Sequence, residues 1–478
     1  MPESFPIYRS SLEYVCTNCR KRFEIDQLYY TCPDCGGVFL LEDTGFDTLK
    51  QTSGAEWQKL FDRRMASKTN ALRGIFRFYE LIAPVLDEQD IVYLGEGNTP
   101  IIDASEALRK EVGLDFAFKN DGQNPSASFK DRGMACAFSF LRSLANKQGW
   151  TNVLAVCAST GDTSAAAAMY AAYLGQPFKS VVLLPKGKVT VQQLAQPLGS
   201  GATVLELPGV FDDCMKVVEK LAEEYRVALL NSKNSWRVLG QESYSYEVAQ
   251  WFDWDLNDKL LFVPIGNAGN ISAIMSGLLK MLDLGIIEKL PRLFGVQTAH
   301  ADPVWQYYQK PKTQRRYQPV QVRPSVAQAA MIGDPVSFPR VKLLVDRYEE
   351  RLGEFMVIQV DEQSIMDSML LANRHGHIAC TQGGECLAAL RQSLGRGWVK
   401  AGEKAILDAT AHMLKFSGFQ EMYFAGNFPP AYGVTPNPAL INKPLQLLSE
   451  KQKADLGRQE FTAEAARSMA EILDLKKK

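Results

Sequence analysis

Apolar segments of strand length alternate with segments of helix length through the middle of the chain. Strand-like residues 152–159, 179–185 and 202–208 are separated by helix-like residues 163–175 and 190–201. Strands and helices that alternate in this way form parallel sheets covered by helices on both faces. The pattern therefore predicts an α/β fold.

A second series of the same kind follows further along the chain. Residues 259–266 and 292–298 are strand-like, and residues 270–285 between them are helix-like. Before both series, residues 45–92 read as polar and amphipathic helix, with helical spacing over residues 65–82. A chain of 478 residues is too long for one small core, so we expect more than one sheet.

Charge and hydropathy exclude several classes of function. The 53 Lys and Arg nearly cancel the 54 Asp and Glu, which leaves no long-range field to attract nucleic acid or an anionic membrane. No apolar run reaches the roughly 20 residues that a membrane span needs. The start "MPESFPIYRS" lacks the regions of a signal peptide, so we expect a cytoplasmic protein without membrane or nucleic-acid partners.

Four of the nine cysteines form a pattern near the N-terminus. Cys16, Cys19, Cys32 and Cys35 have the spacing C-x2-C-x12-C-x2-C, which is typical of two knuckles around one zinc ion. A relic knuckle without metal is the alternative. The segment has few basic residues, which favours a structural role over nucleic-acid binding. The other five cysteines are dispersed and are interpreted as reduced thiols.

Two glycine-rich segments follow predicted strands. "ASTGDTSAA" (158–166) offers hydroxyls and backbone amides at a helix start, and "PIGNAGN" (264–270) allows backbone amides to approach a phosphate closely. Either segment taken alone could be an ordinary capping turn.

Two further segments complete a chemical set. "SASFKDRGMA" (126–135) carries Lys130 behind a phenylalanine, and "DATAHMLKF" (408–416) places Thr410 after a predicted strand end, with His412 interpreted as structural. A lysine that can form an imine, an amide cup for phosphate and a neutral hydroxyl for a ring nitrogen are what pyridoxal phosphate requires.

These segments, together with "LGEGNTP", "NSWRVLGQES" and "IGDPVS", resemble the threonine synthase family of fold-type II pyridoxal-phosphate enzymes, in the family's order. The resemblance implies two three-layer domains with mostly parallel sheets, the tryptophan synthase β-like fold, after a small N-terminal zinc-ribbon-like segment. We expect this segment at residues 1–45, a small domain at 131–244, and a large domain built from 46–130 and 245–478.

The resemblance also implies roles for individual residues. Lys130 is expected to be the Schiff-base lysine and proton shuttle, with Phe129 keeping it dry. The cofactor is expected to contact Lys130, Asp162, Gly266, Asn267, Ala268, Gly269, Asn270 and Thr410. The substrate is expected to contact Ser159, Thr160, Thr163, Asn231, Ser232, Arg237 and Asn270.

The implied activity is that of a lyase that converts O-phospho-L-homoserine and water to L-threonine and phosphate, so the partner is a small phosphorylated amino acid. Cysteate synthase acting on O-phosphoserine and sulfite, serine/threonine dehydratase and a non-catalytic binding protein are the alternatives. The segment "ACTQGGECLAAL" (379–390) departs from the family's Pro-His-Thr-Gly order near the cofactor ring. A homodimer is our hypothesis for the assembly.

Overall fold

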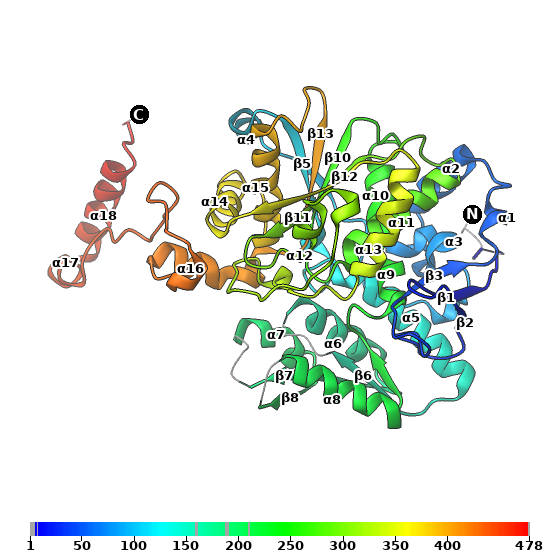
Figure 1. The fold of residues 1–478 in the computed structure, drawn as a ribbon. Helices are drawn as coiled ribbons and strands as arrows, with labels where there is room; N and C mark the ends of the chain where they lie inside the picture. The colour runs from blue at the N-terminus through cyan, green and yellow to red at the C-terminus, as the bar shows by residue number, and fades with distance from the viewer. Residues whose placement is uncertain (1–4, 7, 158–160, 187–190, 209–210, 477–478) are drawn as a thin grey trace.

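The computed structural model describes residues 5–6, 8–157, 161–186, 191–208 and 211–476. Its strands form three separate sheets (Figure 1). Among the described residues, no helix has both the length and the apolar character of a membrane span.

The largest sheet has six strands in the order β12-β11-β10-β13-β5-β4, all parallel except for β4, which is antiparallel to β5. Its strands are β4 (Ile101–Asp103), β5 (Asp115–Asn120), β10 (Lys259–Pro264), β11 (Arg292–Thr298), β12 (Phe355–Val360) and β13 (Lys404–Ala409). The helices around it are α4 (Glu106–Val112), α5 (Lys130–Gln148), α9 (Ser235–Gln241), α10 (Ser243–Trp251), α11 (Gly269–Asp283), α12 (Pro303–Tyr308), α13 (Phe338–Glu350), α14 (Glu362–Arg374) and α15 (Thr381–Gly395).

Strand β10 shows why this sheet lies between two helical layers. Leu260 and Phe262 belong to the core beneath α14 and α15, whereas Leu261 and Val263 belong to the core shared with α11 and α13. Successive side chains of a strand point to opposite faces. A continuous apolar strand therefore needs cover on both sides, and the α/β prediction is confirmed.

A second sheet of four parallel strands lies beside the large one in the order β8-β7-β6-β9 (Figure 1). Its strands are β6 (Val153–Cys157), β7 (Phe178–Pro185), β8 (Thr203–Leu207) and β9 (Val227–Leu229), and its helices are α6 (Asp162–Leu174), α7 (Val191–Gly199) and α8 (Phe211–Glu224). Val182 packs with α6, and its neighbour Leu183 packs with α8 on the opposite face.

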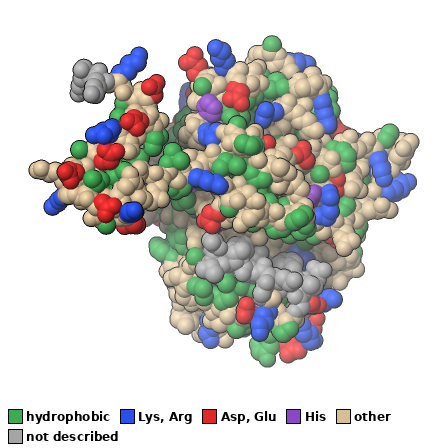
Figure 2. Space-filling view, turned by 90° about the vertical axis from the view of Figure 1, so that its left-hand side faces the viewer, with side chains coloured by type: hydrophobic (Ala, Val, Ile, Leu, Met, Phe, Trp, Pro, Cys, Tyr) green, Lys and Arg blue, Asp and Glu red, His purple; other side chains and the backbone are tan. Residues whose placement is uncertain are grey.

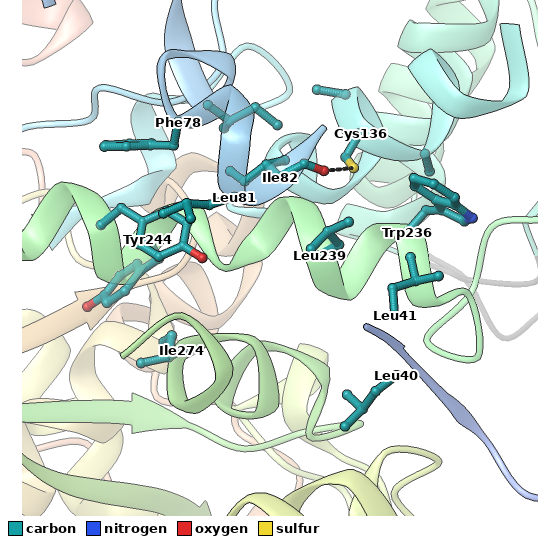
Figure 3. Packing of buried hydrophobic residues seen from close by; sticks show 14 of the residues in the cluster. Leu40, Leu41, Phe78, Leu81, Ile82, Cys136, Trp236, Leu239, Tyr244 and Ile274 are labelled. Atoms are coloured by element: carbon teal, nitrogen blue, oxygen red, sulfur yellow. Dashed lines mark hydrogen bonds between the residues drawn. The ribbon is translucent and has the colours of Figure 1, made fainter. Parts of the chain in front are cut away.

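The N-terminal sheet is small and antiparallel, in the order β2-β1-β3. Its strands are β1 (Leu12–Cys16), β2 (Arg22–Glu24) and β3 (Phe39–Asp43), followed by the helices α1 (Phe46–Leu49), α2 (Gly54–Met65) and α3 (Tyr79–Ile82). Leu40 and Leu41 of β3 join the same core as Trp236 and Leu239 of α9, as Figure 3 shows.

The prediction of helix over residues 65–82 is wrong for most of its length. Helix α2 ends at Met65, and two 3-10 turns, Asn70–Leu72 and Gly74–Phe78, precede the short α3. Gly74 has a φ of +55°, and a Cβ there would meet the carbonyl oxygen of Glu96 at 2.1 Å. This close approach interrupts the helix, although the apolar spacing continues.

The C-terminal segment extends away from the sheets. It contains α16 (Ser417–Ala425), α17 (Glu450–Asp455) and α18 (Arg458–Ile472), and none of the described residues of α17 and α18 is buried. Figure 1 shows these two helices apart from the body of the molecule. On the face that Figure 2 displays, acidic and basic side chains are intermingled.

Charged side chains are buried where α5, α10 and the end of β5 meet. Arg132 donates to Asp121 at 2.8 and 2.9 Å and to Glu247 at 2.7 Å, and Lys119 donates to Glu247 at 2.7 Å. Burial alone would raise the pKa of Glu247, but Arg132, Lys119 and Arg77 hold it well below its ordinary value. Glu247 therefore balances several buried cations.

We expect Glu247→Gln to lower the free energy of unfolding by about 3–5 kcal/mol, because buried cations lose their counter-charge. Urea denaturation measures the change. The control is Glu354→Gln, which removes an exposed ion pair with Arg292 and is expected to cost at most about 1 kcal/mol. A loss at Glu247 no larger than the control would contradict the role of the network.

Candidate active site

The segments predicted to hold the cofactor meet at one edge of the large sheet. Strands β10, β13 and β5 are neighbours, and their carboxyl ends lead to residues 265–270, to Thr410 and to the turn before Lys130. Ligands of such sheets bind beyond the carboxyl ends of the strands. The topology therefore brings together segments that lie up to 280 residues apart in sequence.

Lys130 is the first residue of α5 and is partly buried. The backbone N–H of Phe129 donates to the carbonyl oxygen of Thr410 at 2.9 Å, which fixes the start of the helix against the end of β13. The Nζ atom of Lys130 lies 4.1 Å from the centroid of the Phe129 ring. Within the described part of the chain, it has no hydrogen bond or ion pair.

The surroundings of Lys130 favour a neutral amine. Burial lowers the pKa of Lys130 to about 7, and the positive charge of Arg237 acts in the same direction, while Asp162 opposes them. An unprotonated amine is the form that attacks an aldehyde. This lysine is therefore prepared for imine chemistry near neutral pH.

Two glycines allow α5 and α9 to cross closely. A Cβ at Gly133 would lie 2.8 Å from the carbonyl oxygen of Arg237, and one at Gly240 would lie 2.3 Å from that of Arg132. A larger residue at either position would push the helices apart. The crossing explains the glycine of the "FKDRG" motif, and it keeps Arg237 near Lys130.

Arg237 is a buried cation without a carboxylate partner among the described residues. It is 2% exposed, its Nη1 donates to the carbonyl oxygen of Leu230 at 3.0 Å, and its Nε has no partner there. Burial lowers the pKa of Arg237 to about 10. A guanidinium in this state is suited to bind an anion such as phosphate.

Asn231 and Ser232 lie in the turn between β9 and α9. The Oδ1 atom of Asn231 accepts from the backbone N–H of Lys233 at 2.9 Å, and the side chain of Asn234 caps α9. The predicted residues Asn231, Ser232 and Arg237 are therefore held in one short segment.

The predicted phosphate cup lies between β10 and α11. Ala268 has a φ of +62°, and the carbonyl oxygen of Asn267 accepts from the backbone N–H of Ser337 at 3.1 Å. A Cβ at Gly266 would lie 3.0 Å from the Cα of Ala330, so a side chain there would require this neighbour to shift. The first N–H groups of a helix have no partner within it, so the start of α11 at Gly269 can bind phosphate.

Asn270 links the cup to the central strand. Its Nδ2 donates to Oδ2 of Asp408 at 2.9 Å, and its Oδ1 is buried without a partner among the described residues. Burial raises the pKa of Asp408 well above its ordinary value. An unpartnered buried oxygen at this position is an observation that fits a bound ligand.

Segment 379–390, which departs from the family's Pro-His-Thr-Gly order, lies beside Thr410. Ala379 pairs with His412 in an isolated bridge, and the Sγ atom of Cys380 lies 3.9 Å from Oγ1 of Thr410. Burial raises the pKa of the Cys380 thiol to about 11, so the thiol is protonated near neutral pH. The ring of His412 accepts from the backbone N–H of Leu414, in agreement with a structural role.

Asp162 begins α6 and forms an ion pair with Lys415 at 2.9 Å. Lys415 also donates to the carbonyl oxygen of Ser126 at 2.8 Å. Lys415 belongs to the segment "DATAHMLKF", but the sequence pattern predicts no role for it. Thr163 lies half-buried in the first turn of α6, whereas the predicted residues Ser159 and Thr160 lie outside the described residues.

The four N-terminal cysteines form one cluster, whose Sγ atoms all lie within 4.8 Å of one another. Cys16 and Cys35 are 3.4 Å apart and Cys19 and Cys32 are 3.7 Å apart. Four thiolates around one zinc ion lie about 3.8 Å apart, given Zn–S bonds of about 2.3 Å. The cluster is therefore suited to hold zinc.

Comparison with known proteins gives consistent matches. Residues 92–407 match the family model described as pyridoxal-phosphate dependent enzyme. The chain is 36% identical to the threonine synthase of Methanocaldococcus jannaschii, over 84% of this chain and 92% of that relative. It is 34% identical to threonine synthase 2 (chloroplastic) of Arabidopsis thaliana, over 85% of this chain and 77% of that relative.

Solved structures agree in fold. The crystal structure of threonine synthase from Escherichia coli matches with a TM-score of 0.62 at 20% identity, covering 93% of this chain and 95% of that one. The maize serine racemase structure matches with a TM-score of 0.54 at 19% identity, covering 73% and 97%.

The lowered pKa of Lys130 gives a prediction for cofactor loading. We expect the rate at which cofactor-free protein takes up pyridoxal phosphate to rise about ten-fold between pH 6 and pH 8 and then to level, because the neutral amine reacts. The visible absorbance of the lysine-bound cofactor measures this rate. Arg237→Met should move the midpoint upward, and a wild-type midpoint above pH 9 would contradict the assignment.

Proposed function

The chain belongs to the threonine synthase family of pyridoxal-phosphate-dependent enzymes, and on this basis we propose that it converts O-phospho-L-homoserine and water to L-threonine and phosphate. Two neighbouring side chains carry the proposal. The pKa of Lys130 is lowered to about 7, and the buried Arg237 has no carboxylate partner among the described residues. The amine of Lys130 is suited to hold an aldehyde cofactor, and the guanidinium of Arg237 is suited to hold a phosphorylated substrate.

We assign the cofactor's phosphate to the cup of Gly266, Asn267, Ala268, Gly269 and Asn270, and its ring nitrogen to the hydroxyl of Thr410. Asp162, held by Lys415, is assigned to the cofactor from the side of α6. Pyridoxal phosphate, when bound, supplies the electron sink that stabilises negative charge on the substrate's carbon atoms.

The chain's own residues would then move the protons and hold the phosphate. The amine of Lys130 removes one proton from the substrate's α carbon and one from its β carbon; it delivers one to the γ carbon once the phosphate has left and returns one to the α carbon, with the Phe129 ring shielding it from water. Arg237, Asn231 and Ser232 hold the γ-phosphate, which leaves with its bonding electron pair. Water then supplies the hydroxyl at the β carbon and gives its remaining proton to the released phosphate, which balances the replacement.

The substrate's carboxylate is assigned to the start of α6, where Thr163 lies, together with Ser159 and Thr160. We retain residues 131–244 as a small domain, residues 46–130 with 245–478 as the large domain, and residues 1–45 as the zinc-ribbon-like segment. The four-stranded sheet, β6 to β9, supports the small domain because all its strands fall within those bounds.

Two alternatives differ in what they require. A serine/threonine dehydratase needs no site for a substrate phosphate, so the buried guanidinium of Arg237, which has no carboxylate partner among the described residues, favours a phosphorylated substrate. Cysteate synthase would use the same guanidinium for O-phosphoserine. The products therefore have to separate this rival from threonine synthase.

We expect purified protein given O-phospho-L-homoserine to release threonine and phosphate in equal amounts, and given O-phosphoserine with sulfite to release no cysteate. Lys130→Ala should lose turnover by at least about 10³-fold, and also the visible band of the cofactor at about 410–430 nm. Lys147→Ala, at an exposed site on the same helix, is the control. Cysteate as the product would transfer the assignment to the rival enzyme, and full activity of Lys130→Ala would refute both.

We also propose a homodimeric cytoplasmic enzyme with one structural zinc ion per chain. The exposed side chains of Leu445, Met469 and Leu475 on the C-terminal extension support a contact with a second copy. All nine cysteines are free of disulfides, which suits a reducing compartment. The Cys16, Cys19, Cys32 and Cys35 cluster supports the metal.

Native mass spectrometry tests the assembly and the metal together. We expect a species of twice the chain mass of 53.2 kDa that carries two zinc ions. Cys16→Ser with Cys35→Ser should remove the zinc, whereas Cys214→Ser, a buried cysteine outside the cluster, should retain it. A monomer would refute the dimer, and a zinc-free wild type would refute the metal site.

A further inference from the structure

Arg340 of α13 is a second buried arginine with no carboxylate partner among the described residues. It is 0% exposed, and its N–H groups donate to Phe39, Ser232, Lys233, Ser235 and Ser337. Burial lowers the pKa of Arg340 to about 9, as expected for a guanidinium without an opposite charge. Unlike Arg237, it has partners for Nε, Nη1 and Nη2.

The partners of Arg340 belong to three separate parts of the molecule. Its Nε donates to the carbonyl oxygen of Phe39 in β3 at 2.7 Å. Its Nη1 donates to the carbonyl oxygen of Ser232 and to Oγ of Ser337, both at 2.8 Å, and its Nη2 donates to the carbonyl oxygen of Lys233 at 2.9 Å. One side chain thus joins three parts: the N-terminal sheet, the segment 231–237 that is proposed to bind the substrate's phosphate (the substrate-phosphate segment), and Ser337, which contacts the cofactor cup.

Ser337 extends this connection to the cup itself. Its backbone N–H donates to the carbonyl oxygen of Asn267 at 3.1 Å, and its Oγ lies 3.5 Å from the carbonyl oxygen of Ser232. Both segments proposed to bind phosphate therefore rest on the start of α13. A shift of Arg340 would move Ser232 relative to the cup.

Strand β3 gives the substrate-phosphate segment a fixed support. Oγ of Ser235 donates to the same Phe39 carbonyl oxygen at 3.0 Å, and Nε1 of Trp236 donates to the hydroxyl of Tyr14 at 2.9 Å. Figure 3 shows Leu41 of β3 next to Trp236 and Leu239, and Leu40 belongs to the same core. The N-terminal sheet packs along the segment that leads into Arg237.

We propose that Arg340 is a positioning residue for the substrate's phosphate, and that it holds the Ser232 and Lys233 carbonyls against β3 so that Asn231, Ser232 and Arg237 keep their binding geometry. The proposal rests on the proposed function of that segment. A guanidinium offers five N–H donors on three nitrogens in a fixed planar fork and so reaches all these acceptors, whereas an ammonium offers three donors on one nitrogen and reaches only some of them.

The test compares Arg340→Met and Arg340→Lys with the wild-type holoenzyme. We expect Arg340→Met to raise KM for O-phospho-L-homoserine about ten-fold, with kcat changed less than about three-fold, since it displaces a binding segment and leaves Lys130 in place. Inorganic phosphate, titrated against the visible cofactor band, should bind more weakly by a similar factor. Arg340→Lys should recover part of both losses.

The matched control is Arg347→Met. Arg347 lies on the same helix, and its Nη2 lies 3.4 Å from Oε1 of Glu42, which also belongs to β3, but its side chain is 40% exposed. We expect its KM and phosphate affinity to stay within about two-fold of wild type. An equal effect in Arg347→Met would overturn the proposal.

Two further outcomes separate positioning from stability alone. If Arg340→Met and Arg340→Lys melt earlier but keep the wild-type KM and phosphate affinity, Arg340 is merely structural and the proposal fails. If Arg340→Met does not fold, Arg340→Lys decides by the same two measurements. If the wild type makes no threonine, the proposed function fails, while the phosphate titration still tests Arg340 by itself.

Discussion

A buried group of paired charges fixes the first turn of α5, and the candidate site depends on that turn. Arg132 lies two residues after Lys130 and bridges Asp121, the residue that follows β5, and Glu247 of α10. Burying a charge costs several kcal/mol unless its partners are in place, so an arrangement that keeps these pairs is strongly favoured. The same contacts that stabilise the fold therefore set where the lysine begins its helix. Lys119 completes the pairing on the side of the sheet.

Two arginines near Lys130 are buried in opposite electrostatic states. Arg132 faces two carboxylates, and its pKa is raised well above its ordinary value despite burial. Arg237 faces carbonyl and thiol groups, and burial lowers its pKa to about 10. A fully paired cation has no capacity left for a ligand, whereas an unpaired one gains most from binding an anion. The proposed division of roles follows from this difference, because the paired arginine supports the fold and the unpaired one is available for substrate. The unpaired charge also helps to keep Lys130 neutral.

Local patterns carried most of what could be predicted about the fold and the site. The apolar runs that become β6, β7, β8, β10 and β11 were visible in sequence, as was the glycine-rich start of α11, because each depends on neighbours in the chain. Arg132 with Glu247, and Arg340 with Phe39, were not predictable, since 115 and 301 residues separate the partners. The failure over residues 65–82 has the same origin, because the contact of Gly74 with Glu96 overrides the local spacing. The motif "IGDPVS" carries part of the family resemblance, but only the structure places its Ser337 between Arg340 and Asn267.

The two proposed phosphate sites differ in a way that matches their tasks. The cup at Gly269 offers backbone amides at the start of a long helix and no side-chain cation, which suits a cofactor phosphate that stays bound. The segment at Arg237 offers a side-chain guanidinium, which suits a phosphate that arrives with the substrate and leaves after the reaction. A transient ligand cannot organise its own site between turnovers, so the site must be held from outside. Arg340 and strand β3 meet this requirement, because their contacts with Ser232, Lys233 and Ser235 are made by the protein alone.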